Sequence, residues 1–310
     1  MKRYLPLAAG IALCAALPVS AQEAKTYPAP SEIVAAAKAN AWTNIAPTDL
    51  LVMDLAPDSM GKPRRVVIQL MPAPFAQGWV NNIRKLAAAH WWDGTSINRV
   101  QDNYVVQWGD ATEKKPLLAG LVAVPESDYV FRKTLKRPRT LDPLFAPPND
   151  VHRWTSFHAG FPVAGEGTRD SESNWPVHCY AMVGVGRNLS PDTGTGAELY
   201  TVIGHAPRHL DRNIALVGRV IEGIEHMSSL PRGTGALGFY EKQDERVPIM
   251  SVRLGNEARD VPAFEYLSTD SASFAAYAAA RANRRDPFFN VPAGGADICN
   301  IPVPVRRKEK

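Results

Sequence analysis

The chain has 310 residues, of which 45% are hydrophobic and 21% are charged, and its formal net charge at pH 7 is +4. A chain of this length and apolar content can bury one large core with extensions, which excludes a disordered protein. The near balance of acidic and basic side chains gives no argument for a nucleic-acid partner, and we expect none.

The N-terminus has the pattern of a secretory signal peptide. Lys2 and Arg3 precede an apolar run over residues 5–17, and Val19-Ser20-Ala21 places small residues at the first and third positions before a cleavage site. The run is shorter than the roughly 20 residues of a spanning helix, and a proline interrupts it. We therefore expect a signal peptide at 1–21, no membrane span after its removal, and a periplasmic or secreted protein.

The next segments predict a hairpin followed by a helix. Two β-rich runs at 48–55 and 65–70 flank the turn-forming sequence P-D-S-M-G-K-P. An amphipathic helix is then predicted before the Asp93-Gly94 turn, because apolar residues recur there at helical spacing. These residues are Phe75, Trp79, Ile83 and Leu86.

The most informative segment runs from Trp91 to Asp110 and reads W-W-D-G-T-S-I-N-R-V-Q-D-N-Y-V-V-Q-W-G-D. It resembles the strand-turn-strand of the cyclophilin peptidyl-prolyl isomerases, in which a Tyr-Asp-Gly turn leads into F-H-R-V and then F-M-x-Q-G-G-D. The resemblance implies that Arg99 and Gln107 occupy the positions of that family's catalytic pair.

The later β-rich runs are consistent with the same family. With the segments above, they give seven or eight strands and two helices, which suit a closed antiparallel barrel with plugged ends. The resemblance covers roughly 47–255 and implies a mainly β fold, a closed eight-stranded antiparallel barrel with two capping helices. The further predicted strands are 104–108, 180–185, 199–203, 214–220 and 248–254, and a short helix is predicted at 222–230.

Three segments lie outside this pattern. Residues 22–46 form an N-terminal extension, and residues 111–178, rich in proline, charge and aromatics, read as a long insertion. In the C-terminal extension, 256–310, a helix is predicted over 271–285, with Ser271 or Asp270 as its N-cap.

The two cysteines of the mature chain leave two possibilities open. An exported protein can bridge Cys179 to Cys299, which would join the barrel to the C-terminal extension. The alternative is a pair of unrelated buried thiols. The apolar run H-C-Y-A-M-V around Cys179 slightly favours the thiols, because a free cysteine packs well in such a strand.

The chemistry of X-Pro rotation explains why an arginine matters. The barrier is roughly 18–20 kcal/mol because the amide nitrogen shares its lone pair with the carbonyl group. A catalyst must favour the twisted state, in which that lone pair can accept a hydrogen bond. Arg99 can supply the donor because a guanidinium stays charged and presents several N–H groups in one plane. Gln107 can orient that guanidinium or bind the substrate backbone.

The apolar socket for the proline ring departs from the family. Tyr104 and Val105 replace a Phe-Met pair, and Ala197-Glu198-Leu199-Tyr200 replaces S-Q-F-F. Ile214 stands where the family often has a histidine. The predicted substrate-binding residues are Tyr104, Val105, Leu199, Tyr200, His209 and Leu210.

Competing motifs are weaker. G-T-G-A-L-G at 233–238 satisfies G-x-G-x-x-G but lacks the strand before it and the helix after it that a nucleotide site requires. His205 and His209 have metal-ligand spacing, but Pro207 lies between them and a third ligand is missing. We expect no metal and no cofactor.

Two functions therefore remain open. The first is an exported peptidyl-prolyl cis-trans isomerase that assists the folding of exported proteins. The second is a catalytically weak cyclophilin-like chaperone or binding module. Both would take Pro-containing segments of unfolded or folding polypeptides as partners.

Overall fold

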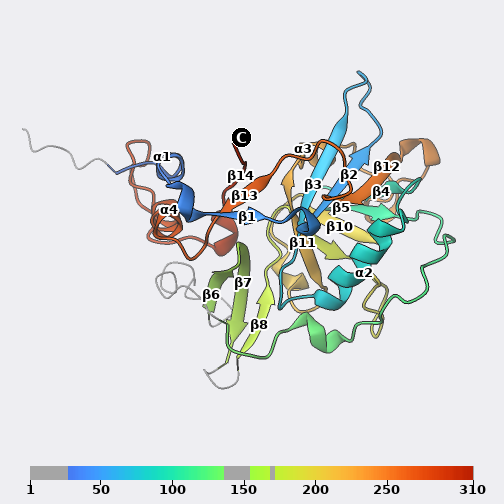
Figure 1. Cartoon of the computed structure of the whole chain (residues 1–310), viewed down its shortest axis with the longest axis horizontal. Helices are drawn as coiled ribbons and strands as arrows, with labels where there is room; N and C mark the ends of the chain where they lie inside the picture. The colour runs from blue at the N-terminus through green and yellow to red at the C-terminus, as the bar shows by residue number, and fades with distance from the viewer. Residues whose placement is uncertain (1–26, 136–153, 168–171, 310) are drawn as a thin grey trace, which may run out of the picture.

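The computed structural model describes residues 27–135, 154–167 and 172–309. Its centre is a closed barrel of eight antiparallel strands, as the sequence predicts (Figure 1). The apolar residues of these strands fill its interior. In order around the barrel the strands are β10 (Leu199–Val202), β5 (Val105–Gly109), β4 (Ser96–Val100), β12 (Val247–Leu254), β2 (Leu50–Leu55), β3 (Arg64–Leu70), β11 (Leu216–Glu222) and β9 (Met182–Val185).

The predicted hairpin and both predicted helices are present. Strands β2 and β3 pair from Leu50↔Gln69 to Leu55↔Arg64. Helix α2 (Gln77–Ala88) packs against β11 and β12, and the short helix α3 (Glu225–Ser228) packs against β3. The predicted apolar face of α2 is buried, since Phe75, Trp79, Ile83 and Leu86 are all at most 3% exposed.

Two three-stranded sheets lie outside the barrel, and no pattern in the sequence predicted them. One belongs to the insertion and contains β6 (Trp154–His158), β7 (Phe161–Glu166) and β8 (Ser173–Pro176). The other pairs the two extensions, because β13 (Phe264–Leu267) lies between β1 (Trp42–Ile45) and β14 (Val305–Arg307). Strands from the two extensions, β1 and β14, therefore share one sheet.

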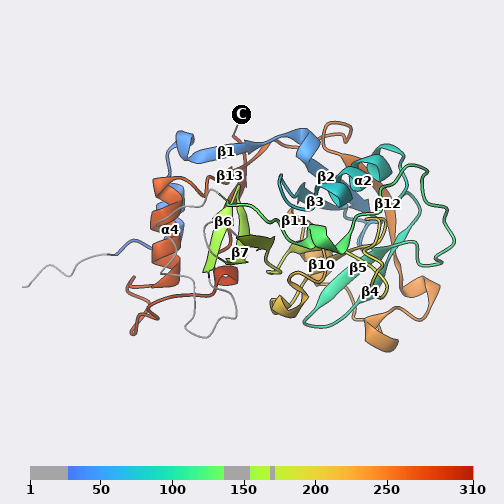
Figure 2. The same ribbon diagram turned by 90° about the horizontal axis from the view of Figure 1, so that it is seen from below.

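These sheets and two helices gather on one side of the barrel (Figures 1 and 2). Helix α1 (Pro30–Ala35) packs against α4 (Ala272–Ala282), whose predicted N-cap Ser271 accepts a hydrogen bond from the Phe274 backbone N–H. The Phe274 ring also meets Phe157 of β6 at a centroid distance of 4.9 Å. The described part of the N-terminal extension, strands β6 to β8 of the insertion and the C-terminal extension thus form one packed unit beside the barrel.

A disulfide bond ties this unit to the barrel. Cys179 and Cys299 are bonded, with their Cα atoms 5.1 Å apart. The preference for two separate thiols is therefore wrong. Cys179 precedes β9 rather than lying within it, and the C-terminal extension folds back to bring Cys299 beside it. Local apolar sequence could not reveal that long-range approach. The predicted signal peptide at 1–21 lies outside the described residues.

Candidate active site

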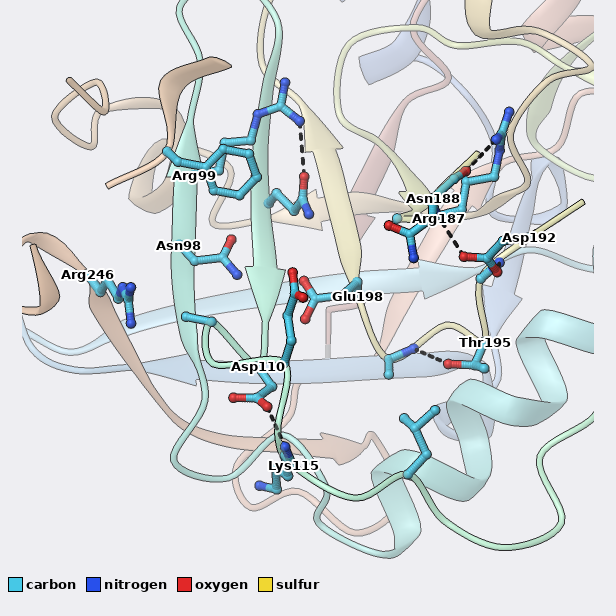
Figure 3. Close-up of a pocket in the computed structure, with 18 of the residues that line it drawn as sticks. Asn98, Arg99, Asp110, Lys115, Arg187, Asn188, Asp192, Thr195, Glu198 and Arg246 are labelled. Atoms are coloured by element: carbon cyan, nitrogen blue, oxygen red, sulfur yellow. Dashed lines mark hydrogen bonds between the residues drawn. The ribbon is translucent and has the colours of Figure 1, made fainter. Parts of the chain in front are cut away.

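Arg99 and Gln107 lie opposite each other on neighbouring strands. They are register partners of β4 and β5, so their side chains project from the same face of the hairpin. Arg99 Nη1 donates a hydrogen bond to Gln107 Oε1 across 3.1 Å (Figure 3). The two residues that the sequence singled out are therefore in direct contact.

Three neutral oxygens hold the Arg99 guanidinium. Besides the bond to Gln107, Nε donates to the Leu237 carbonyl oxygen across 2.8 Å, and Nη2 donates to Gln101 Oε1. These bonds use three of the five N–H groups of an arginine, which leaves two for another acceptor. Partial burial lowers the pKa of Arg99, although the group remains a cation.

Aromatic rings complete the surroundings of the guanidinium. Its carbon lies 5.7 Å from the centroid of the Tyr104 ring and 5.3 Å from that of Phe239. Such cation–π contacts favour the charge and limit the motion of the side chain. Arg99 is therefore positioned before any ligand binds.

The glycine motif at 233–238 has a structural role. The Gly233 N–H donates to the Val100 carbonyl oxygen. A Cβ atom added at Gly238, where φ is +80°, would lie 2.7 Å from Gln101 Cα. The motif thus lets a loop approach β4 closely enough for Leu237 to bind Arg99. The motif therefore lies in a loop against β4, and it is not the strand-to-helix turn that a nucleotide site requires.

A small apolar cluster lies on the same side of the barrel as Arg99 and Gln107. Val105 and Val202 are register partners on β5 and β10, and Tyr200 pairs with Gln107. Tyr104 and Leu210 are half-buried against these residues. The cluster consists of Val105, Tyr200 and Val202, with Tyr104, Leu210 and Ile214 packed against them. We call these six residues the socket.

The structure separates Leu199 from the other predicted binding residues. Leu199 pairs with Trp108, and both side chains are at most 1% exposed within the barrel core. The expectation that Leu199 lines the socket is therefore corrected, because side chains alternate between the two faces of a strand. His209 does lie at the socket, where its ring stacks on Tyr104 with centroids 6.3 Å apart.

A buried polar chain behind the socket was missed by sequence reasoning. The Tyr200 hydroxyl donates to His178 Nε2 across 2.8 Å, and His178 Nδ1 donates to Asp211 Oδ1 across 2.8 Å. Burial lowers the pKa of His178 and outweighs the opposing effect of Asp211, so the ring is neutral. Arg208 binds the other Asp211 oxygen at 2.7 Å. These contacts fix the Tyr200 ring from behind.

A pocket of about 700 Å³ opens on the other side of the Arg99–Gln107 pair (Figure 3). Asn98 reaches it because a β-bulge between Ile97 and Arg99 adds one residue to β4. Glu198, which precedes β10, also lines it. Burial raises the pKa of Glu198 to about 7.

Comparison with known proteins decides the family. Residues 62–254, more than half of the chain, match the family model described as "Cyclophilin type peptidyl-prolyl cis-trans isomerase/CLD". The chain belongs to the cyclophilin-type peptidyl-prolyl cis-trans isomerases. The matched residues include β3, the β4–β5 hairpin that carries Arg99 and Gln107, and strand β10 of the socket. None of the curated proteins matches the sequence.

One solved cyclophilin structure supports the fold, and a second is reported beside it. The crystal structure of cyclophilin AquaCyp293 from Hirschia baltica is 22% identical, with a TM-score of 0.63, and the match covers 87% of this chain and 95% of that chain. The similar fold thus extends beyond the part that the family model matches. A Cryptosporidium parvum cyclophilin type peptidyl-prolyl cis-trans isomerase, solved in the presence of the dipeptide Ala-Pro, is 10% identical with a TM-score of 0.37 and covers 66% of this chain and 98% of that chain.

Two features are absent from the described residues. Among residues 27–135, 154–167 and 172–309, no helix has the length and apolar character needed to span a bilayer. The same residues contain no group of three or more His, Cys, Asp or Glu side chains arranged to hold a metal ion.

Proposed function

We propose that this cyclophilin is exported and accelerates the isomerisation of X-Pro bonds in exported polypeptides, with Arg99 and Gln107 as its catalytic pair. The observation that supports this most strongly is their direct contact beside an apolar socket. A Pro-containing segment would place its ring in the socket and its prolyl nitrogen near the guanidinium.

The proposed mechanism is differential binding of the twisted amide. In the planar amide the prolyl nitrogen accepts no hydrogen bond, because its lone pair is delocalised. As the bond twists, that lone pair localises and can accept from one of the two remaining N–H groups of Arg99. An interaction that exists only in the twisted state lowers the barrier, whereas equal binding of both states does not.

Gln107 has a supporting role in this mechanism. Its side-chain oxygen holds Nη1, while Leu237 and Gln101 hold the other two nitrogens. The guanidinium therefore need not reorganise when the amide twists. The socket aligns the proline ring through Tyr104, whose own ring is held by stacking on His209.

The deciding experiment is a proline-isomer assay on a short X-Pro peptide with the mature protein. Wild type should accelerate isomerisation, and Arg99→Ala should lose on the order of 100-fold, equivalent to about 3 kcal/mol of transition-state stabilisation. Equal rates for wild type and a folded Arg99→Ala variant would show that Arg99 is not the catalytic group.

A second function is favoured by the altered socket. Val105 is smaller than the methionine, and Ile214 is less polar than the histidine, that the family often carries at these positions. A looser socket would bind proline segments with little turnover. The protein would then be a chaperone or binding module. Titration of a Pro-containing peptide distinguishes the two functions, because a module binds the peptide without accelerating its isomerisation.

Export has its own test. The proposal requires a mature chain that begins near Gln22, because Val19-Ser20-Ala21 has the form that signal peptidase cleaves. Mass spectrometry of the protein purified from its native host should show this N-terminus. Retention of Met1 would contradict export and the proposed class of clients.

A further inference from the structure

The carboxyl group of Glu198 lies against Gly109, in the space that the side chain of any other residue at that position would fill. Glu198 lies across from Gly109, one position beyond the Leu199↔Trp108 pair. A Cβ atom added at Gly109 would lie 1.9 Å from Oε1 and 2.5 Å from Oε2 of Glu198. The carboxyl group therefore rests directly on the backbone of β5, next to the strand position of Gln107.

This carboxyl group is buried and only partly satisfied. Burial raises its pKa to about 7, and the Asp110 backbone N–H and the side-chain amides of Gln107 and Asn98 oppose that rise by hydrogen bonding. Two acceptor atoms in the pocket, Glu198 Oε2 and Asn98 Oδ1, have no partner among the described residues. A proton on Oε2 would relieve the burial of an unpartnered acceptor, so the site can accommodate either protonation state.

We propose that Glu198 is a positioning residue, which holds the Gln107 amide with its oxygen towards Arg99 and releases that hold when it binds a proton. The inference rests on the proposed catalytic role of Arg99 and Gln107. Gln107 Oε1 already accepts from Arg99 Nη1, so Nε2 is the end left for Glu198. Both side chains border Gly186, where an added Cβ atom would lie 2.9 Å from Glu198 Cβ and 3.6 Å from Gln107 Nε2. In the proposed arrangement, the three side chains form one chain of hydrogen bonds that ends on the guanidinium.

The charge of the Glu198 carboxyl group sets the strength of its hydrogen bond to Gln107. A carboxylate accepts a hydrogen bond about twice as strongly as a neutral group does. The neutral acid also carries a donor of its own, which can compete for Gln107 Oε1. If the Gln107 side-chain amide flips, its NH2 group faces Arg99 in place of its oxygen. Two hydrogen-bond donors then point at each other. Arg99 would then lose one of its three anchors.

Other charged groups that line the pocket do not explain a transition near neutral pH. Burial disfavours the charge of Asp110, but backbone N–H groups and Thr112 lower its pKa, and backbone N–H groups from Gly194 and Asn188 lower that of Asp192. Arginine stays charged throughout. The charged groups besides Arg99 and Glu198 are Asp110, Glu113, Lys115, Arg187, Asp192 and Arg246.

One further titratable group faces the pair from the socket side. His209 stacks on Tyr104, which lies 5.7 Å from the guanidinium carbon. A test must therefore separate His209 from Glu198.

The test is the pH profile of kcat/KM in a protease-free isomerisation assay. The kcat/KM of wild type should rise about 5-fold from pH 5.5 to pH 8.5, which corresponds to the effect of one hydrogen bond. Glu198→Gln should remain active with a flat profile, because a glutamine side chain can accept from Gln107 at every pH. His209→Gln should keep the wild-type ratio of kcat/KM between the two pH values, whatever its rate at either pH. A flat wild-type profile, or a Glu198→Gln variant that keeps the slope, overturns the inference.

A second measurement does not depend on turnover. The side-chain NH2 resonances of Gln107 should shift with pH in wild type, with a midpoint near 7, and should stay fixed in Glu198→Gln. Resonances that do not move in wild type overturn the role of Glu198. If wild type isomerises no peptide at any pH but these resonances titrate, the proposed function fails while the hold of Glu198 on Gln107 stands.

Discussion

The Tyr200 hydroxyl donates to His178 Nε2 across 2.8 Å, and both side chains are nearly inaccessible to solvent. The Tyr200 ring of the socket is thus fixed by a buried polar contact through its hydroxyl group. Asp211 in turn holds His178, and it binds Arg208, whose guanidinium is 3.5 Å from Asp297 of the C-terminal extension.

Replacing Tyr200 with Phe should destabilise the protein by about 1–3 kcal/mol, because it leaves the buried His178 Nε2 without a donor. Urea unfolding of the variant measures this cost. Tyr104→Phe is the matched control, since Tyr104 is half-buried, and its unfolding free energy should change by less than about 0.5 kcal/mol. Equal stability of Tyr200→Phe and wild type would show that the contact contributes nothing.

The stability of the protein should depend on pH through Glu198. Its pKa is about 7 in the folded state against an ordinary value of 4.5, so the folded protein binds this proton more tightly than the unfolded chain does. The resulting stability is fully present below about pH 4.5 and is lost as the pH rises through about 7. Between pH 5 and pH 8, the unfolding free energy of wild type should therefore fall by on the order of 2 kcal/mol relative to that of Glu198→Gln.

Glu113→Gln is the control for that experiment. Glu113 lines the same pocket but is exposed, and the replacement should leave the difference between the two pH values unchanged. A Glu198→Gln variant with the same pH dependence as wild type would place the proton on another group.

Lysine at position 99 should recover little of the activity that alanine loses. An ammonium group keeps the charge but not the planar fork that binds Leu237, Gln107 and Gln101 at once. We expect kcat/KM of Arg99→Lys to stay within about 10-fold of Arg99→Ala. Arg212→Ala, which removes an exposed arginine paired with Glu166, should keep wild-type activity. Full activity of the lysine variant would mean that charge alone suffices.

The disulfide should stabilise the protein without taking part in catalysis. Cys179 and Cys299 are 120 positions apart in the sequence, and a crosslink over such a loop contributes about 2–4 kcal/mol. Replacing both with alanine should lower the unfolding free energy by that amount and leave kcat/KM within about 2-fold. Thiol labelling of the unfolded, unreduced mature protein should detect no free cysteine. Two reactive thiols would contradict the bridge.

The barrel could be predicted because its signals are local. Each strand carries its own β-rich run, α2 has its apolar face at helical spacing, and the segment from Trp91 to Asp110 contains both Arg99 and Gln107 within one hairpin. The contact between those two residues follows from strand pairing across a short turn.

The remaining features depend on contacts between distant segments. Strand β1 pairs with β13, more than 200 positions away, so neither short strand has a local partner to reveal it. The sequence could not separate Leu199 from Tyr200 because adjacent apolar residues read alike until the register is known. The role of His178 was hidden for the same reason, since its partners come from β10 and from the turn at Asp211.

The pairing of β13 with both β1 and β14 also sets an order of events during synthesis. The last barrel strand, β12, ends at Leu254, so every barrel strand exists before β14 has been made. The sheet that joins the two extensions can be completed only after Arg307 has left the ribosome. A truncated chain that ends after β12 would expose the edge of β1, and unpaired edges of this kind recruit strands from other molecules.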